Sequence, residues 1–189
     1  MRTDKDTTLK DFIFYTDLFK SDEKQIGDLF RKLESTEPPP YILNKPAPKN
    51  LNDLTFGQLI QIQSVKTIED MLFVPLDVIL NINKEKALTC KAFDIIRFML
   101  FIQKELTRIG KLFSEIKYRP SAEEIQAGIN QIDNGIFGTI DWYARRMGIT
   151  DHSEVESIPW IRIYKCLEMD NKQALFEKKL REIYSKKIK

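Results

Sequence analysis

The residues that could carry chemistry in this chain are few. His152 is the only histidine among 189 residues, and Cys90 and Cys166 are the only cysteines. A Ser-His-Asp or Cys-His mechanism would therefore need His152 as its base. His152 stands in the segment Thr150-Asp151-His152-Ser153, which is typical of a loop that leads into a helix cap. We interpret His152 as a surface loop residue.

The other polar patterns do not point to a reactive centre either. Each cysteine lies in an apolar helical pattern without a neighbouring base, which predicts buried structural thiols and a reducing compartment. Asp133-Asn134-Gly135 begins like a calcium loop, but Phe137 and Thr139 cannot continue its ligand set. The sequence contains neither a phosphate-binding glycine motif nor a zinc-protease motif. It therefore predicts no catalytic centre, no metal and no cofactor.

Basic residues gather near the end of the chain. Lysines and arginines outnumber acids strongly there, although the net charge of the whole chain is only +2. Such a segment could contact phosphates, for instance packaged DNA, or simply complement the dipole of a final helix turn. The candidate nucleic-acid contacts are Lys178, Lys179, Arg181, Lys186, Lys187 and Lys189.

Prolines cluster between residues 38 and 48, which hold five of the eight prolines in the chain. Proline removes an amide donor and favours extended backbone, so we expect a Pro-rich linker over 38–50. It would separate an N-terminal helical arm, 1–37, from a main domain, 51–189. The run Pro38-Pro39-Pro40-Tyr41 also matches a ligand of WW domains. The candidate partner contacts are Pro38, Pro39, Pro40, Tyr41, Pro46 and Pro48.

Residues 140–163 carry the spacing of a helix-turn-helix, with a small residue at Ala144, a turn glycine at Gly148 and an apolar Ile149. The second helix of that motif would present Asp151, Glu154 and Glu156 to the phosphates, which opposes binding. A small DNA-binding regulatory protein with a divergent helix-turn-helix is therefore the alternative function.

The clearest pattern is an apolar repeat over 88–116 with alternating spacings of four and three. Only one side of a long helix presents such a repeat, so we expect a helix over about 86–117. Its members are Leu88, Ala92, Ile95, Met99, Ile102, Leu106, Ile109, Phe113 and Ile116. The first half is apolar nearly all round, which favours the core of an intramolecular bundle over an intersubunit coiled coil. The narrower second half makes Leu106, Ile109, Phe113 and Ile116 candidate contacts with one partner.

Shorter helical patterns flank this repeat. We expect helices from Thr55, from Thr67 with an interruption at Pro75, over 137–147 ending at Gly148, over 160–169 and over 171–186. The fold class is thus an all-α multi-helix bundle around one long central helix, with the helical arm and Pro-rich linker at its N-terminal side. No apolar run approaches the roughly 20 residues of a membrane span, so we expect no membrane contact.

Two segments resemble a known family. The run of residues 135–144, followed by Gly148, Glu154-Val155 and Ile158-Pro159-Trp160, resembles the C-terminal part of tail assembly chaperones of tailed bacteriophages. Residues 54–60 look like the opening of the same kind of domain. Composition and the Pro-rich arm are similar to small virion proteins of crAss-like Bacteroides phages.

The resemblance implies a non-enzymatic protein that acts in virion assembly. It would be either a structural component of the head–tail or portal-vertex region, or a tail assembly chaperone. Its partners would be other virion or assembly proteins, with a homo-oligomer or ring as the expected state. Its location would be the virion or the host cytoplasm. The family works through surfaces, so the resemblance carries no functional residue over to this chain.

Overall fold

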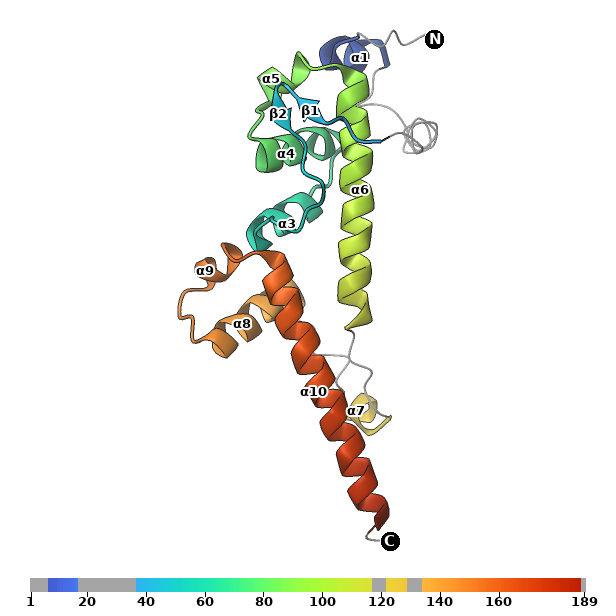
Figure 1. The fold of residues 1–189 in the computed structure, drawn as a ribbon, viewed down its shortest axis with the longest axis vertical. Coiled ribbons are helices and arrows are strands. Elements are labelled where there is room, and N and C mark those ends of the chain that lie inside the picture. Colours follow the sequence, from blue (N-terminus) through green and yellow to red (C-terminus); the bar gives the residue numbers. More distant parts are fainter. Residues whose placement is uncertain (1–6, 17–36, 117–121, 129–133, 188–189) are drawn as a thin grey trace. The chain divides into compact units, whose positions relative to one another are not determined.

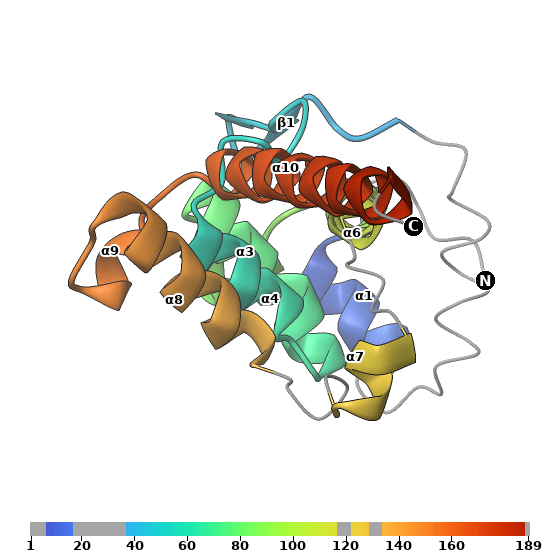
Figure 2. The same cartoon turned by 90° about the horizontal axis from the view of Figure 1, so that it is seen from below.

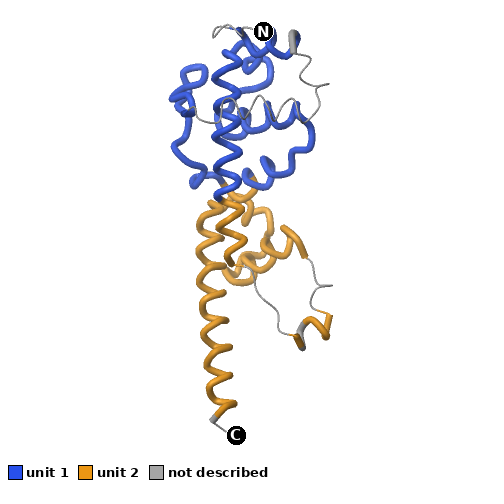
Figure 3. Tube along the Cα trace, turned by 90° about the vertical axis from the view of Figure 1, so that its right-hand side faces the viewer, with its two compact units in different colours: residues 1–54, 58–108 blue, residues 55–57, 109–189 orange. Residues whose placement is uncertain are grey.

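A computed structural model describes residues 7–16, 37–116, 122–128 and 134–187 (Figure 1). Its regular elements are helices apart from one short hairpin, which confirms the predicted all-α fold with a long helix near its centre. The chain divides into two compact units (Figure 3). Unit 1 comprises residues 1–54 and 58–108, and unit 2 comprises residues 55–57 and 109–189. Each unit has buried apolar side chains of its own.

Unit 1 contains α1 (Leu9–Thr16), the hairpin β1 (Tyr41–Ile42) and β2 (Lys45–Pro46), and α5 (Lys84–Leu88). It also holds α4 (Ile68–Leu80), most of α3 (Phe56–Gln63) and the first part of α6 (Ala92–Glu115). The described part of the predicted N-terminal arm belongs to this unit, because Leu9 and Phe12 of α1 are buried. The apolar surface that they remove from water attaches α1 to the rest of unit 1.

Helix α4 begins at the predicted place. The side chain of Thr67 accepts a hydrogen bond from the Asp70 amide at 3.0 Å, as an N-cap residue should. The predicted interruption at Pro75 is wrong, because α4 continues through it from Ile68 to Leu80. Pro75 is buried together with Leu72 and Leu76, so packing outweighs the hydrogen bond that proline cannot make.

The long helix is shorter than its repeat predicts. It begins at Ala92 rather than near residue 86, and the separate helix α5 ends at Leu88. Between them the chain pairs with residues 7–9, where α1 begins. The Leu9 amide donates to the Cys90 carbonyl at 2.8 Å, and the Ala92 amide donates to the Thr7 carbonyl at 2.9 Å. These backbone bonds to a distant segment replace helical ones, and the helix breaks there.

The predicted Pro-rich linker is folded over much of its length. Tyr41 pairs with Pro46 and Ile42 with Lys45 in the antiparallel hairpin, and Ile42 is buried. The Lys45 ammonium donates to the carbonyls of Leu80 and Asn81, at 2.6 and 2.9 Å. A cation at the C-terminal end of α4 complements the helix dipole and the carbonyl groups that the helix leaves unpaired there.

Unit 2 contains the end of α6, then α7 (Ala122–Gln126), α8 (Gly135–Met147), α9 (His152–Glu156) and α10 (Trp160–Lys187). Helices α8 and α9 lie side by side (Figures 1 and 2). Gly148 ends α8 as predicted, in the left-handed conformation with φ of 67°. The two predicted helices over 160–169 and 171–186 form the single helix α10. The core of unit 2 consists of Phe56, Ile109, Ile140, Tyr143, Ala144, Val155, Trp160, Ile163 and Tyr164.

A short segment far away in sequence completes unit 2. Thr55 forms an antiparallel bridge with Pro159, and the Phe56 amide donates to the Ile158 carbonyl at 2.8 Å. Phe56 is buried, and Gly57 lies so close to Glu156 that a Cβ atom there would be 3.1 Å from the Glu156 Cβ. This contact explains why residues 55–57 belong to unit 2.

Candidate functional site

His152 is the first residue of α9 and contacts two residues of α8. Its Nε2 lies 3.5 Å from the Asp141 carboxylate, which also pairs with Arg145, and its ring meets Phe137 edge-on. The neighbouring Asp151 caps α9 by accepting the Ser153 amide at 2.8 Å. The hydroxyl and amide of Ser153 hold the pKa of Asp151 below its usual value. These contacts connect α9 to α8 and serve to hold the two helices together.

The cysteines lie in different surroundings. Cys90 is buried in unit 1, and burial, followed by the charge of Asp94, raises the pKa of its thiol. A raised pKa lowers the thiolate population on which reactivity depends. Cys166 is half-buried in unit 2 and forms a hydrogen bond with Arg146, which also pairs with Asp170 at 2.8 Å. No group of histidine, cysteine and acidic side chains within the described residues has the arrangement of a metal site.

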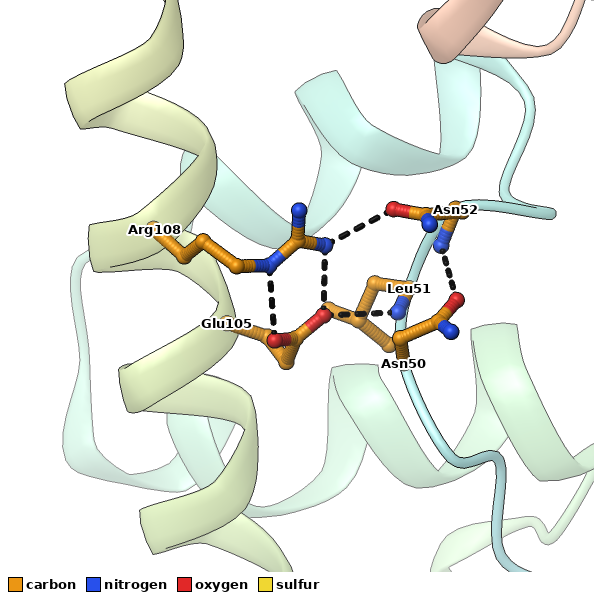
Figure 4. A network of polar contacts seen from close by, with 5 residues as sticks. All are labelled: Asn50, Leu51, Asn52, Glu105 and Arg108. Atoms are coloured by element: carbon orange, nitrogen blue, oxygen red, sulfur yellow. Dashed lines mark hydrogen bonds and ion pairs between the residues drawn. The ribbon is translucent and has the colours of Figure 1, made fainter.

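A charged network in unit 1 holds the chain just after the hairpin (Figure 4). The Glu105 carboxylate accepts two hydrogen bonds from Arg108, at 2.8 and 2.7 Å, and one from the Leu51 amide at 2.9 Å. Arg108 also donates to the Asn52 side chain at 2.7 Å. The Arg108 guanidinium lowers the pKa of Glu105 and partial burial opposes that shift, while the bond from Leu51 reinforces it. The network attaches residues 50–52 to α6 and leaves no acid or base poised for a substrate.

The proline-rich candidates differ in exposure. Pro38, Pro40, Pro46 and Tyr41 are exposed, Pro48 is half-buried and Pro39 is buried. Pro40 and Ala47 are joined by a backbone hydrogen bond of 2.9 Å. Because Pro39 and Ile42 face the interior of unit 1, a ligand-like extended conformation of 38–41 would have to leave the fold. Tyr41, which is 61% exposed, is a large apolar side chain of this group that a partner could reach.

The candidates on the second half of α6 are largely covered by the chain itself. Ile109 is fully buried, and Phe113 packs against Trp160 and Tyr164 of α10, with ring centroids 6.0 and 5.5 Å apart. Leu106 and Ile116 are half-buried. Phe113 of this seam thus contacts a helix of the same chain within unit 2.

The structure describes four of the six basic candidates in full. Lys178 is half-buried, and Lys179, Arg181 and Lys186 are exposed on α10. Lys187 is the last helical residue and its side chain lies outside the described part, as does the whole of Lys189. Residues 140–163 do contain a helix, a turn and a second helix, but α9 has only five residues and exposes Glu154 and Glu156. A helix of this length and charge is poorly suited to a major groove.

Unit 1 contains an apolar cavity of about 470 Å³. Among its lining residues are Phe12 of α1, Leu72 of α4 and Met99 of α6, and those described along its wall carry no charge. A cavity of this kind can accept apolar atoms.

A row of exposed apolar side chains lies on α10. Met169, Phe176 and Ile183 are 61%, 59% and 51% exposed, at intervals of seven residues. Gln173 and Leu180 lie between them on the same face of the helix. We call Met169, Gln173, Phe176, Leu180 and Ile183 the α10 stripe. Its alternating spacing of four and three residues is visible in the sequence, as is that of the repeat over 88–116.

Comparisons of the chain with protein families, with curated proteins and with solved structures find no match for it. Within the described residues, no helix combines the length and the apolar character needed to cross a membrane.

Proposed function

We propose that this chain is a non-enzymatic assembly protein of a tailed bacteriophage. It acts as a structural component of the head–tail region or as a tail assembly chaperone, and it works by docking onto other assembly proteins. The α10 stripe carries this proposal. Three large apolar side chains exposed in one row on a helix are costly in water, and rows of this kind mark contact sites in soluble proteins.

Two further observations support the same proposal. His152 and Cys90 have structural surroundings. His152 of α9 contacts Asp141 of α8, and Cys90 is buried, which raises the pKa of its thiol. The resemblance of residues 135–160 to tail assembly chaperones falls on α8, α9 and the start of α10, the region from which the stripe extends. A protein that functions through a surface needs no reactive centre.

Particle association tests this proposal. We expect the chain to be found by mass spectrometry in purified particles, or in assembly intermediates from infected cells. A variant with Met169→Ser, Phe176→Ser and Ile183→Ser should lose that association while keeping its helical circular dichroism. Leu175→Ser is the matched control, because Leu175 is also 50% exposed on α10 but lies off the stripe. Retained association of the triple variant would contradict the proposal.

The alternative, a DNA-binding regulator, has a different signature. It would bind duplex DNA with a steep salt dependence, through the basic side chains Lys178, Lys179, Arg181 and Lys186. Substituting these four residues by glutamine should then abolish DNA binding, whereas the triple change in the stripe should not. If these DNA-binding results were obtained and the chain were absent from particles and intermediates, DNA binding would be favoured over assembly as its function.

A further inference from the structure

The α10 stripe has the spacing of a coiled-coil seam. From Met169 to Ile183 its members alternate steps of four and three, which places Gln173 and Leu180 at a, and Met169, Phe176 and Ile183 at d. A seam of this kind is complementary to another helix with the same repeat. One polar residue at an a position, here Gln173, is a recurrent device that sets register in such pairs.

The residues beside the stripe carry opposite charges on its two sides. The g positions are Lys165, Lys172, Lys179 and Lys186, all exposed. The e positions are Asp170, Glu177 and Tyr184. A helix with one basic edge and one acidic edge matches a parallel copy of itself, since g of one strand faces e of the other five residues further on. An antiparallel copy would bring lysine edge to lysine edge.

We infer that α10 binds the α10 of a second copy of this chain as a parallel, in-register two-stranded coiled coil. The inference rests on the proposed function and names the first partner of the stripe. The pairing joins Lys172 of each copy to Glu177 of the other. Lys165 would face Asp170, but Asp170 already pairs with Arg146 of α8 at 2.8 Å, so Lys172 and Glu177 provide the main ionic contact.

The pairing leaves the core of unit 2 intact. Trp160 and Met169 are nine residues apart, about 2.5 helical turns, so they lie on opposite faces of α10. Trp160, Ile163 and Tyr164 are buried within unit 2, while the stripe begins at Met169 on the other side. The contacts that Lys172 and Glu177 make now, with Glu168 and Gln173 at 2.8 Å each, are exposed and within one helix. Such pairs are worth little and exchange readily.

The oligomeric state of the full chain is the first test. Two heptads form a marginal coiled coil, so we expect a dimer that dissociates on dilution between about 1 mM and about 1 µM. Sedimentation equilibrium measures this directly. Phe176→Ser should weaken the dimer at least about tenfold, because a large side chain leaves the seam. The control Leu175→Ser should leave the dissociation constant within about threefold, as expected for a residue off the seam.

Disulfide trapping tests orientation and register. In a Cys166→Ser background, Gln173→Cys places two thiols in one a layer of a parallel dimer, within reach of a disulfide. Ala174→Cys is the matched control, one residue further on and directed away from the seam. Under mild oxidation by oxygen we expect cross-linked dimer from Gln173→Cys and little from Ala174→Cys. Equal cross-linking of the two variants would overturn the parallel register.

Charge exchange tests the ionic contact. Lys172→Glu and Glu177→Lys each place like charges opposite one another and should weaken the dimer about tenfold. The double variant restores opposite charges in a parallel homodimer and should recover most of the affinity. Circular dichroism at high dilution, where the chain is monomeric, shows whether a substitution changes the helicity of α10 itself. Failure of the double variant to recover affinity would contradict the pairing.

These results can be separated from the proposed function. A chain that stays monomeric at every concentration, yet joins particles only when the stripe is intact, would overturn the self-pairing and support assembly with another partner. A stable parallel dimer that never joins particles or intermediates would support the pairing and contradict the assembly function.

Discussion

At the residue scale, the partly buried Glu105 carboxylate has partners that lower its pKa. Hydrogen bonds from Arg108 and from the Leu51 amide hold its pKa below the usual value. A carboxyl whose pKa is lowered by folding stabilises the fold at pH values above its unfolded pKa, near 4.3, and this contribution is lost as the pH falls through the folded pKa. Glu105→Gln should therefore lower the free energy of unfolding by about 1–3 kcal/mol at pH 7.

Urea unfolding monitored by circular dichroism measures this loss. The difference between Glu105→Gln and the natural chain should shrink when both are measured below the folded pKa, because the natural carboxyl is then protonated as well. Glu85→Gln is the matched control in unit 1, since Glu85 is exposed on α5. A loss of the same size in the control, or a loss independent of pH, would contradict the role of the network in Figure 4.

At the element scale, two helical glycines of unit 2 should respond with opposite signs. A Cβ at Gly57 would stand 3.1 Å from the Glu156 Cβ and 3.2 Å from the Glu156 carbonyl oxygen, neither of which is the end of a flexible side chain. Gly57→Ala should therefore lower stability by about 1 kcal/mol. A Cβ at Gly110 on α6 has no described atom within 4 Å, so Gly110→Ala should raise stability by about 0.5–1 kcal/mol.

Chemical unfolding of both variants under one condition gives the comparison. Each change adds one methyl group to a helix, so the two variants differ mainly in what that methyl group meets. Opposite signs of the change in the free energy of unfolding would therefore report the close contact between Gly57 and Glu156. If Gly57→Ala stabilised the chain as much as Gly110→Ala, the backbone at Gly57 would not be in close contact with Glu156, and this prediction would be wrong.

Local signals predicted several helix ends, and distant contacts account for the errors. Thr67 and Gly148 act through atoms within a few residues of themselves, so their cap roles could be inferred from the sequence. The break before Ala92 depends on hydrogen bonds to Thr7 and Leu9, more than 80 positions away, which no local pattern reveals. Proline usually interrupts a helix, and the local sequence does not reveal that Pro75 is buried inside α4.

The candidate surface shows the same limit. A seven-residue repeat is readable in α6 and in α10, but sequence alone does not say which one the chain covers. Within unit 2, Ile109 of α6 is buried and Phe113 packs against α10, whereas Phe176 and Ile183 of α10 remain exposed. Whether an apolar repeat is buried depends on which other helices pack against it, and a local sequence pattern does not contain that information.

At the scale of the whole molecule, the second half of α10, which carries most of the stripe, contributes no buried side chain to the core of unit 2. The last buried side chains of α10 are Ile163 and Tyr164, and every described side chain after Asn171 is exposed or half-buried. Deleting residues 172–189 should therefore leave the free energy of unfolding within about 0.5 kcal/mol of that of the dissociated natural chain, as for changes remote from a core. The ion pair lost with Lys172 is exposed and contributes little.

The same deletion should remove the concentration dependence of thermal unfolding. A dimer that binds only folded chains raises its own Tm with protein concentration, so the natural chain should show that rise and the shortened chain should not. A deeper deletion, of residues 165–189, is the control. It also removes Cys166 and Asp170, the partners of Arg146 on α8, and should lower stability at every concentration. A shortened chain ending at Asn171 that unfolds as easily as this control would show that the second half of α10 supports the core, and the assignment of that half to a partner would then fail.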